Sequence, residues 1–156
     1  MNRPTTPPVT SLYEQDETAW LEMMAQLLDE RRFAELDHKH LSEFLWDMSR
    51  RDRREVLSRL TVLLVHLLKW EHQPDRRNAS WEATILNQRE ELRDLLESRT
   101  LWNHALEVLP KAYGRAVKQA ALETGLAAGS FPAECAMSLE EIVGQNQEKA
   151  EQNASQ

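Results

Sequence analysis

The sequence predicts an all-α protein, organised as an up-and-down helical bundle of four to five main helices with a short C-terminal helix and flexible termini. Ala, Leu, Glu and Arg are frequent, and the 156 residues include only 4 Gly and 6 Pro. β-Branched residues never alternate with polar ones over the length of a strand. Because 41% of the residues are hydrophobic, the chain can bury a core. We expect one domain over residues 13–144 and a disordered tail at 145–156.

The N-terminal third of the chain predicts an arm followed by two helices. Residues 1–12 contain three prolines among small polar residues and are expected to form a flexible arm. Asp16 favours the start of a helix over residues 16–31, where apolar residues recur at helical spacing. Asp37 favours the start of a second helix over residues 38–49.

A third helix is expected to form the centre of the core. Ser49 or Asp52 is a candidate N-cap, which separates this helix from the one before it. Its apolar residues fill nearly half of the helical wheel, an arc wide enough for a helix with neighbours on several sides. They are Val56, Leu57, Leu60, Leu63, Leu64, Leu67, Leu68 and Trp70.

The C-terminal half predicts two longer helices and a short one. Ser80 is a candidate N-cap for a helix over residues 80–98. Apolar residues keep the helical phase over residues 101–124, but Pro110 has no backbone N–H to donate, so we expect a break there. A short helix is expected over residues 139–143.

Charge and cysteine content narrow the function classes. The formal net charge of -7 argues against indiscriminate binding to nucleic acid or to anionic membranes. Cys135 is the only cysteine, which excludes an intramolecular disulfide and favours a reducing compartment. The first residues lack the apolar core of a signal peptide, and His66 interrupts the longest apolar run. We therefore expect a cytoplasmic protein that does not span a membrane.

The stretch from Arg59 to Trp81, RLTVLLVHLLKWEHQPDRRNASW, resembles the signature of the bacterial "domain of unknown function 29" family. That signature runs RLxxLLxHLLKW, then QP, R and SW. The resemblance continues at residues 13–33 and at 123–135, where ETGL is followed by FP and C, so it covers about residues 13–143. The chain departs from the family over residues 38–47, where the family has an acidic run. The resemblance implies a helical-bundle fold and a bacterial origin, and it implies no activity.

One set of residues raises the question of a metal. His40, Glu43 and Asp47 are spaced so that they share one face of a helix, and a histidine from a neighbouring helix would complete a bundle metal site. Such sites repeat a Glu-x-x-His motif on two helices, whereas here the order is reversed and occurs once. The spacing therefore favours a solvated helix face, and the sequence predicts no metal and no cofactor.

An enzyme is the alternative interpretation of the polar residues. His66 lies at the edge of the apolar arc of its helix, and Glu43 on the preceding predicted helix is the nearest candidate carboxylate. This pair defines a hydrolase-type alternative, with or without a metal. The preferred interpretation of His66 is a hydrogen-bonded histidine at the boundary of the core. Cys135 has no neighbour in the sequence that would activate it as a nucleophile. No nucleotide loop, zinc signature or nucleophile elbow is present, so the sequence leans away from an enzyme.

The most basic part of the sequence lies between residues 50 and 77, where Arg and Lys outnumber Asp and Glu. Arg76 and Arg77 precede Ser80 at the expected start of a helix, so guanidinium groups and unpaired backbone amides are expected to converge there. We predict an anion-accepting surface, called the 69–81 corner below. Its predicted lining is Lys69, Gln73, Arg76, Arg77 and Ser80, with Trp70 and Trp81 as its floor.

The alternative interpretation of these arginines is structural, with Arg76 or Arg77 paired to Asp75 or Glu71 on a solvated surface. Trp46 lies off the apolar stripe of its helix, which predicts partial exposure and a role as an interface anchor. The preferred function is a non-catalytic interaction module that binds an unknown protein or nucleic-acid partner through the 69–81 corner. Homo-oligomerisation stays open.

Overall fold

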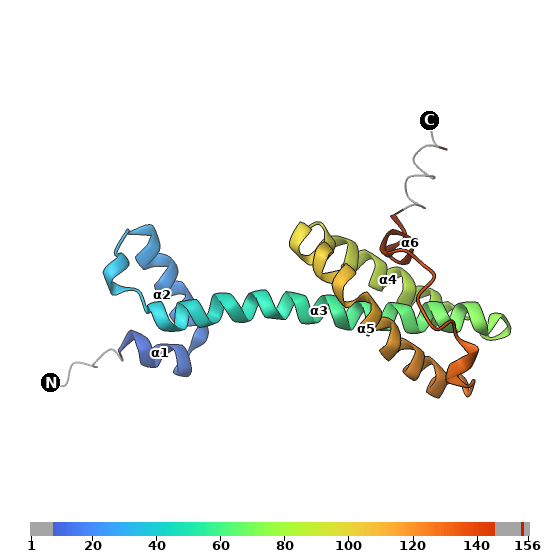
Figure 1. The fold of residues 1–156 in the computed structure, drawn as a ribbon. Coiled ribbons are helices and arrows are strands. Elements are labelled where there is room, and N and C mark those ends of the chain that lie inside the picture. Colours follow the sequence, from blue (N-terminus) through green and yellow to red (C-terminus); the bar gives the residue numbers. More distant parts are fainter. Residues whose placement is uncertain (1–7, 146–153, 155–156) are drawn as a thin grey trace. The chain divides into compact units, whose positions relative to one another are not determined.

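The computed structural model describes residues 8–145 and residue 154. Within these residues all regular structure is helical, which confirms the predicted all-α class. The region predicted as one domain is divided into two compact units, unit 1 ending at Arg50 and unit 2 beginning at Arg51. Helix α3 (His38–His72) contributes its first turns to unit 1 and the remainder to unit 2 (Figure 1).

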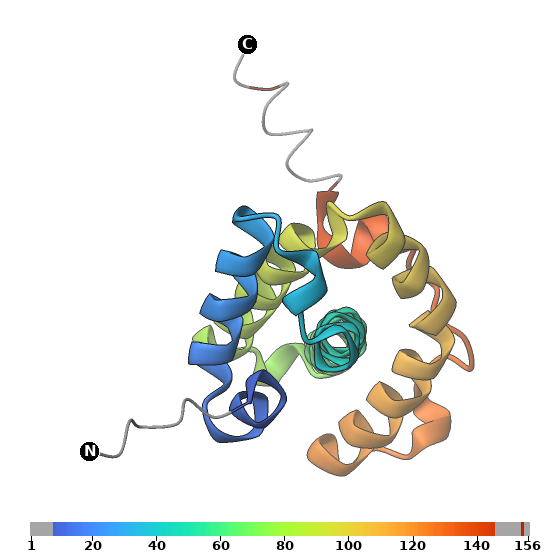
Figure 2. The ribbon, with the colours of Figure 1, turned by 90° about the vertical axis from the view of Figure 1, so that its left-hand side faces the viewer.

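Unit 1 contains α1 (Val9–Gln15), α2 (Glu17–Asp29), the short 3-10 helix η1 (Phe33–Glu35) and the start of α3. The predicted start of the first long helix is confirmed, because the Asp16 carboxylate accepts a hydrogen bond of 3.0 Å from the backbone N–H of Ala19. In unit 1, α1 and α2 lie beside the first turns of α3 (Figure 2).

Residues 9–12 were predicted to belong to the flexible arm, and this is wrong, because they form part of α1. The helix begins directly after Pro8, so the prolines precede it and none falls in its interior. The rest of the predicted arm, residues 1–7, lies outside the described residues. So does the predicted tail, except for residues 145 and 154.

A buried carboxylate organises unit 1. The Asp37 side chain is 2% exposed and accepts a hydrogen bond of 3.2 Å from Trp20 Nε1, while His40 Nδ1 lies 2.7 Å from it. The His40 ring stacks on the Tyr13 ring with centroids 4.4 Å apart. Burial by itself raises the pKa of Asp37, but the hydrogen bonds from His40 and Trp20 outweigh it and hold that pKa below its ordinary value.

Helix α3 is continuous over 35 residues, so the predicted separation into two helices at Ser49 or Asp52 is wrong. Capping residues at these positions are compatible with a helix start but do not impose one. Neither Gly nor Pro occurs between residues 49 and 54, and the four arginines there are good helix formers. The helix therefore continues through a segment that carries only a start signal and no stop signal.

Unit 2 packs α4 (Ala79–Leu96), α5 (Arg99–Thr124) and α6 (Leu139–Val143) around the second part of α3 (Figure 1). The 3-10 helices η2 (Pro74–Arg76) and η3 (Ala128–Ser130) lie in its connections. Most of the predicted arc of α3 is buried, as expected for a central helix. Its fully or nearly fully buried members are Val56, Leu60, Leu63, Leu64 and Leu68, joined by Val65.

Helix α5 passes through Pro110 without a break, so the predicted interruption is wrong. Proline leaves the carbonyl of the residue four positions earlier, Leu106, without its helical donor. Both residues are exposed, so water can hydrate that carbonyl, and the apolar face of α5 stays in phase across the proline. The buried face of α5 is built largely from small residues, which allow close approach of neighbouring helices. They are Ala105, Ala112, Ala116 and Ala120.

The short helix α6 has the predicted bounds. The Ser138 hydroxyl accepts from the Glu141 backbone N–H at 3.2 Å, and the Glu141 carboxylate accepts from the Ser138 backbone N–H at 2.8 Å. Gly144 ends the helix with a φ of 77°, a left-handed conformation that favours glycine. Arg89 of α4 donates to the Ile142 carbonyl at 2.9 Å, which ties the end of α6 to the bundle.

Candidate functional site

The 69–81 corner comprises the last turn of α3, the turn η2 and the first turn of α4, all in unit 2. The structure brings its predicted residues together as two cation–aromatic pairs. The Lys69 ammonium lies 4.5 Å from the centroid of the Trp81 ring, and the Arg77 guanidinium lies 4.9 Å from that of Trp70. Both tryptophans are half-buried beneath these cations.

Lys69 forms an ion pair with a carboxylate of α5. Its Nζ donates to Glu123 Oε2 of α5 at 2.7 Å, and its side chain is only 11% exposed. The hydrogen bond from Lys69, followed by that from Gln119, holds the pKa of Glu123 below its ordinary value. Lys69 is therefore already paired with a carboxylate of this chain, so it is not free to accept an external anion as predicted.

Gln73 connects the corner to the end of α5. Its side-chain amide donates to the Thr124 carbonyl at 3.4 Å, and Gly125, with a φ of 74°, ends the helix there. The Lys69–Glu123 pair spans 54 positions and the Gln73–Thr124 contact 51. The KW, QP, SW and ETG segments of the sequence thus meet at one place in unit 2. Sequence reasoning noted each segment but missed Glu123 and Thr124 as parts of the corner.

Arg77 closes the end of α3. Its Nε donates to the Trp70 carbonyl at 2.8 Å, so it satisfies one of the carbonyls that a helix C-terminus leaves unpaired. The structure shows no pairing of Arg77 with Asp75 or Glu71 in the described part of the chain. Arg77 nevertheless stays exposed, with its guanidinium over Trp70.

The N-cap of α4 is Asn78, which replaces the predicted Ser80. The Asn78 side-chain oxygen accepts from the Trp81 backbone N–H at 3.0 Å, and its side-chain nitrogen donates to the Arg76 carbonyl at 3.2 Å. Ser80 is the second residue of the helix and is exposed. Arg76 is also exposed, and among the described residues its side chain has no ion pair or hydrogen bond. Of the predicted lining, Arg76, Arg77 and Ser80 are thus exposed, together with the neighbouring Asp75 and Asn78.

The alternative enzyme residues do not come together. Both Glu43 and His66 lie on the continuous helix α3, several turns apart, with Glu43 in unit 1 and His66 in unit 2. They were expected to meet because they were predicted to lie on two neighbouring helices, but one helix contains both. His66 Nδ1 donates to the Val62 carbonyl at 2.9 Å, as a boundary histidine does.

Cys135 lies half-buried in the loop before α6, with its Sγ 3.6 Å from the Met137 carbonyl. Burial raises the pKa of this thiol, which lowers the fraction of reactive thiolate. The structure therefore offers no activation of Cys135 as a nucleophile in its described surroundings.

The alternative metal residues are likewise dispersed. His40 is engaged with Asp37, while Glu43 and Asp47 are exposed and Asp47 pairs with Arg50 at 3.1 Å. In residues 8–145, no group of three or more His, Cys, Asp or Glu side chains has an arrangement able to hold a metal ion.

We expect the purified protein to contain no stoichiometric transition metal, because His40 already uses one ring nitrogen on Asp37 and lacks a companion set of ligands. Elemental analysis after gel filtration in metal-free buffer measures this. Zinc, manganese or iron at close to one ion per chain would contradict the expectation, and loss of that ion in a His40→Ala variant would place it in unit 1.

The fold and the corner define a helical protein with two cation–aromatic pairs where α3 ends and α4 begins. The chain belongs to the family described as "Domain of unknown function DUF29", whose model matches residues 12–147. No curated protein and no solved structure matches this chain. None of the helices in the described residues combines the length and apolar character needed to cross a membrane.

Proposed function

We propose that this protein is a non-catalytic interaction module that binds an acidic segment of a partner protein at the 69–81 corner. The observation that carries the proposal is the pair of exposed guanidinium groups, Arg76 and Arg77, held beside the first turn of α4. Two planar guanidinium groups and the unpaired N–H groups of a helix start are suited to carboxylate oxygens.

The rigidity of the turn supports the proposal. Asn78 bonds to both the turn and α4, Arg77 bonds to the end of α3, and Gln73 bonds to the end of α5. Pro74 at the start of η2 further restricts the backbone. A loop that is already held in one conformation loses little entropy on binding, so more of the interaction energy contributes to affinity.

Charge favours a protein partner over a nucleic acid. Lys69 is neutralised by Glu123, which leaves Arg76 and Arg77 as the exposed cations of the corner. A nucleic acid requires a longer basic surface that follows successive phosphates, and the net charge of -7 opposes its approach. A short acidic peptide needs only a local pair of cations. We further propose a bacterial, cytoplasmic setting, which the family resemblance and the single cysteine support.

The test is a titration with a Glu-rich peptide, followed by amide NMR shifts and by calorimetry at low and moderate salt. The double variant Arg76→Ala, Arg77→Ala should weaken peptide binding about tenfold or more, because it removes two charge-assisted contacts. The loss should shrink as salt is added. A matched control, Arg99→Ala with Arg115→Ala, removes two exposed arginines elsewhere in unit 2 and should leave affinity within about twofold.

Two outcomes contradict the proposal. If the double variant unfolds at markedly lower denaturant while its folded fraction binds the peptide normally, the arginines are structural. If an oligonucleotide binds in a manner dependent on Arg76 and Arg77 and the peptide does not, the partner is a nucleic acid.

A further inference from the structure

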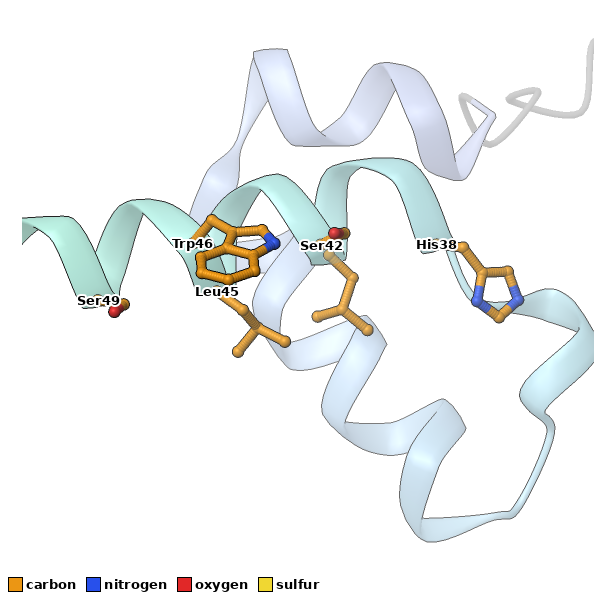
Figure 3. A pocket seen from close by; sticks show the side chains of 6 residues that line it. His38, Ser42, Leu45, Trp46 and Ser49 are labelled. Carbon is orange, nitrogen blue, oxygen red and sulfur yellow. The ribbon is translucent and has the colours of Figure 1, made fainter.

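Unit 1 carries an exposed apolar surface that is separate from the 69–81 corner. Leu45 and Trp46, on α3, are 61% and 62% exposed, and the neighbouring Met48 is 40% exposed. Leu45 and Trp46 border a hollow of about 490 Å³, whose lining is completed by His38, Leu41, Ser42 and Ser49. Figure 3 shows the Trp46 ring and the Leu45 side chain projecting from α3 along this hollow. We call it the Trp46 surface.

Exposure of this kind is costly for an isolated protein. Trp and Leu side chains gain free energy in proportion to the apolar area they remove from water, and an exposed tryptophan next to an exposed leucine is typical of an interface anchor. The buried core of unit 1 does not use them, because it is formed by Trp20, Met24 and Leu27 with other neighbours.

The charge of the chain is concentrated in the same unit. In residues 8–50, Asp and Glu outnumber Lys and Arg by more than two to one, whereas from residue 51 onward the two classes are close to balanced. Glu43 and Asp47 flank Trp46 on α3 and are exposed. Besides burial, the negative charges of Glu17, Asp47 and Glu43 raise the pKa of Tyr13.

Basic side chains only partly offset this charge. Lys39 and Arg50 lie on the same turns of α3, and Arg50 pairs with Asp47 at 3.1 Å. Both members of that pair are more than half exposed, so the pair contributes little and can exchange partners. The surroundings of the Trp46 surface therefore remain favourable to a cation.

We propose that the Trp46 surface docks an amphipathic helix of a partner protein, with an apolar stripe against Leu45 and Trp46 and Lys or Arg along its flank. The apolar stripe supplies the burial that the exposed side chains lack, and the basic flank complements the negative field of unit 1. This partner is opposite in charge to the one proposed for the 69–81 corner, and the inference does not rest on that function.

The probe is a synthetic helical peptide with a leucine stripe and lysine flanks. Two further peptides separate the contributions: one with glutamate in place of lysine, and one with the same composition in scrambled order. We expect the first peptide to bind and the other two to bind at least about tenfold more weakly, because each lacks one of the two complementary features.

The variant Leu45→Ala, Trp46→Ala should weaken binding of the lysine peptide about tenfold or more. The matched control is Leu86→Ala with Leu122→Ala, which trims leucines that are 56% and 86% exposed in unit 2 and should leave binding unchanged. A Glu43→Gln, Asp47→Asn variant should weaken binding and flatten its salt dependence. Circular dichroism checks that each variant stays folded.

Three results would overturn the proposal. Equal binding of the ordered and scrambled lysine peptides would mean that the negative charge of unit 1 alone attracts them. Equal binding of the glutamate peptide would remove the charge argument. A dimer detected by light scattering and abolished by the Leu45→Ala, Trp46→Ala variant would show that the occupant is a second copy of this chain.

Discussion

Replacement of Leu64 by Ala should lower the free energy of unfolding of unit 2 by about 2–5 kcal/mol. Leu64 is 0% exposed and lies in the main core cluster with residues of α3, α4, α5 and α6. The substitution removes buried methyl and methylene groups and leaves a cavity, because close-packed helices cannot collapse fully around the gap. Chemical denaturation followed by circular dichroism measures the loss.

Hydrogen exchange locates that loss, since the two units need not unfold in one step. Protection should fall across α4 and α5 and change little in α2. Leu122→Ala makes the same chemical change at a side chain that is 86% exposed, and it should alter stability by no more than about 0.5 kcal/mol. Val62→Ala, at a half-buried position, should fall between them. Equal losses for Leu64 and Leu122 would mean that α3 is not the central helix of unit 2.

Replacement of Asp37 by Ala should destabilise unit 1, because Trp20 Nε1 and His40 Nδ1 both lose their buried partner. Each buried donor left unsatisfied costs about 1–3 kcal/mol. Hydrogen exchange in α2 and the start of α3 is the most direct measurement, with protection lost there and retained in α4 and α5. Asp47→Ala, which removes an exposed carboxylate ten positions later, is the control and should have little effect. Unchanged protection in the Asp37 variant would show that the buried carboxylate is dispensable.

The same carboxylate should make the stability of unit 1 sensitive to acid. The pKa of Asp37 is lower in the folded protein than its ordinary value, so its stabilising contribution is fully present above that ordinary value. The contribution is lost as the pH falls through the lower folded pKa. Asp37→Asn keeps an oxygen acceptor without the titration, so its acid unfolding curve should be flatter in this range. A wild-type curve parallel to that of the variant would contradict this assignment.

Local signals in the sequence were sufficient for features that depend on a few neighbouring residues. The Asp16 cap and the bounds of α6 both depend on residues within one or two helical turns. Periodicity likewise identified the buried stripe of α3 and the exposure of Trp46, because both follow from the angle between successive side chains.

Only part of the 69–81 corner could be predicted from the sequence. Arg76, Arg77 and the start of a helix are neighbours along the chain, so their proximity followed directly. The engagement of Lys69 by Glu123 did not, because that pair spans 54 positions and forms only when α3 and α5 pack together. The predicted proximity of Glu43 and His66 was wrong. It required two separate helices, and both residues lie on the continuous helix α3.

By itself, then, the sequence determined the all-α class, most helix ends, the apolar face of the central helix and the family. The tertiary structure decided that α5 runs through Pro110 unbroken, that the described residues divide into two units, and which cations of the corner stay exposed. The physical reason is the size of the free energies. A cap or a proline changes the free energy of about one helical turn, whereas the packing of a whole apolar face contributes several times more. Packing therefore overrode the weak local break at Pro110 and selected the partner of Lys69. Helix α3 continues past Ser49 for a local reason, because no residue between 49 and 54 stops a helix.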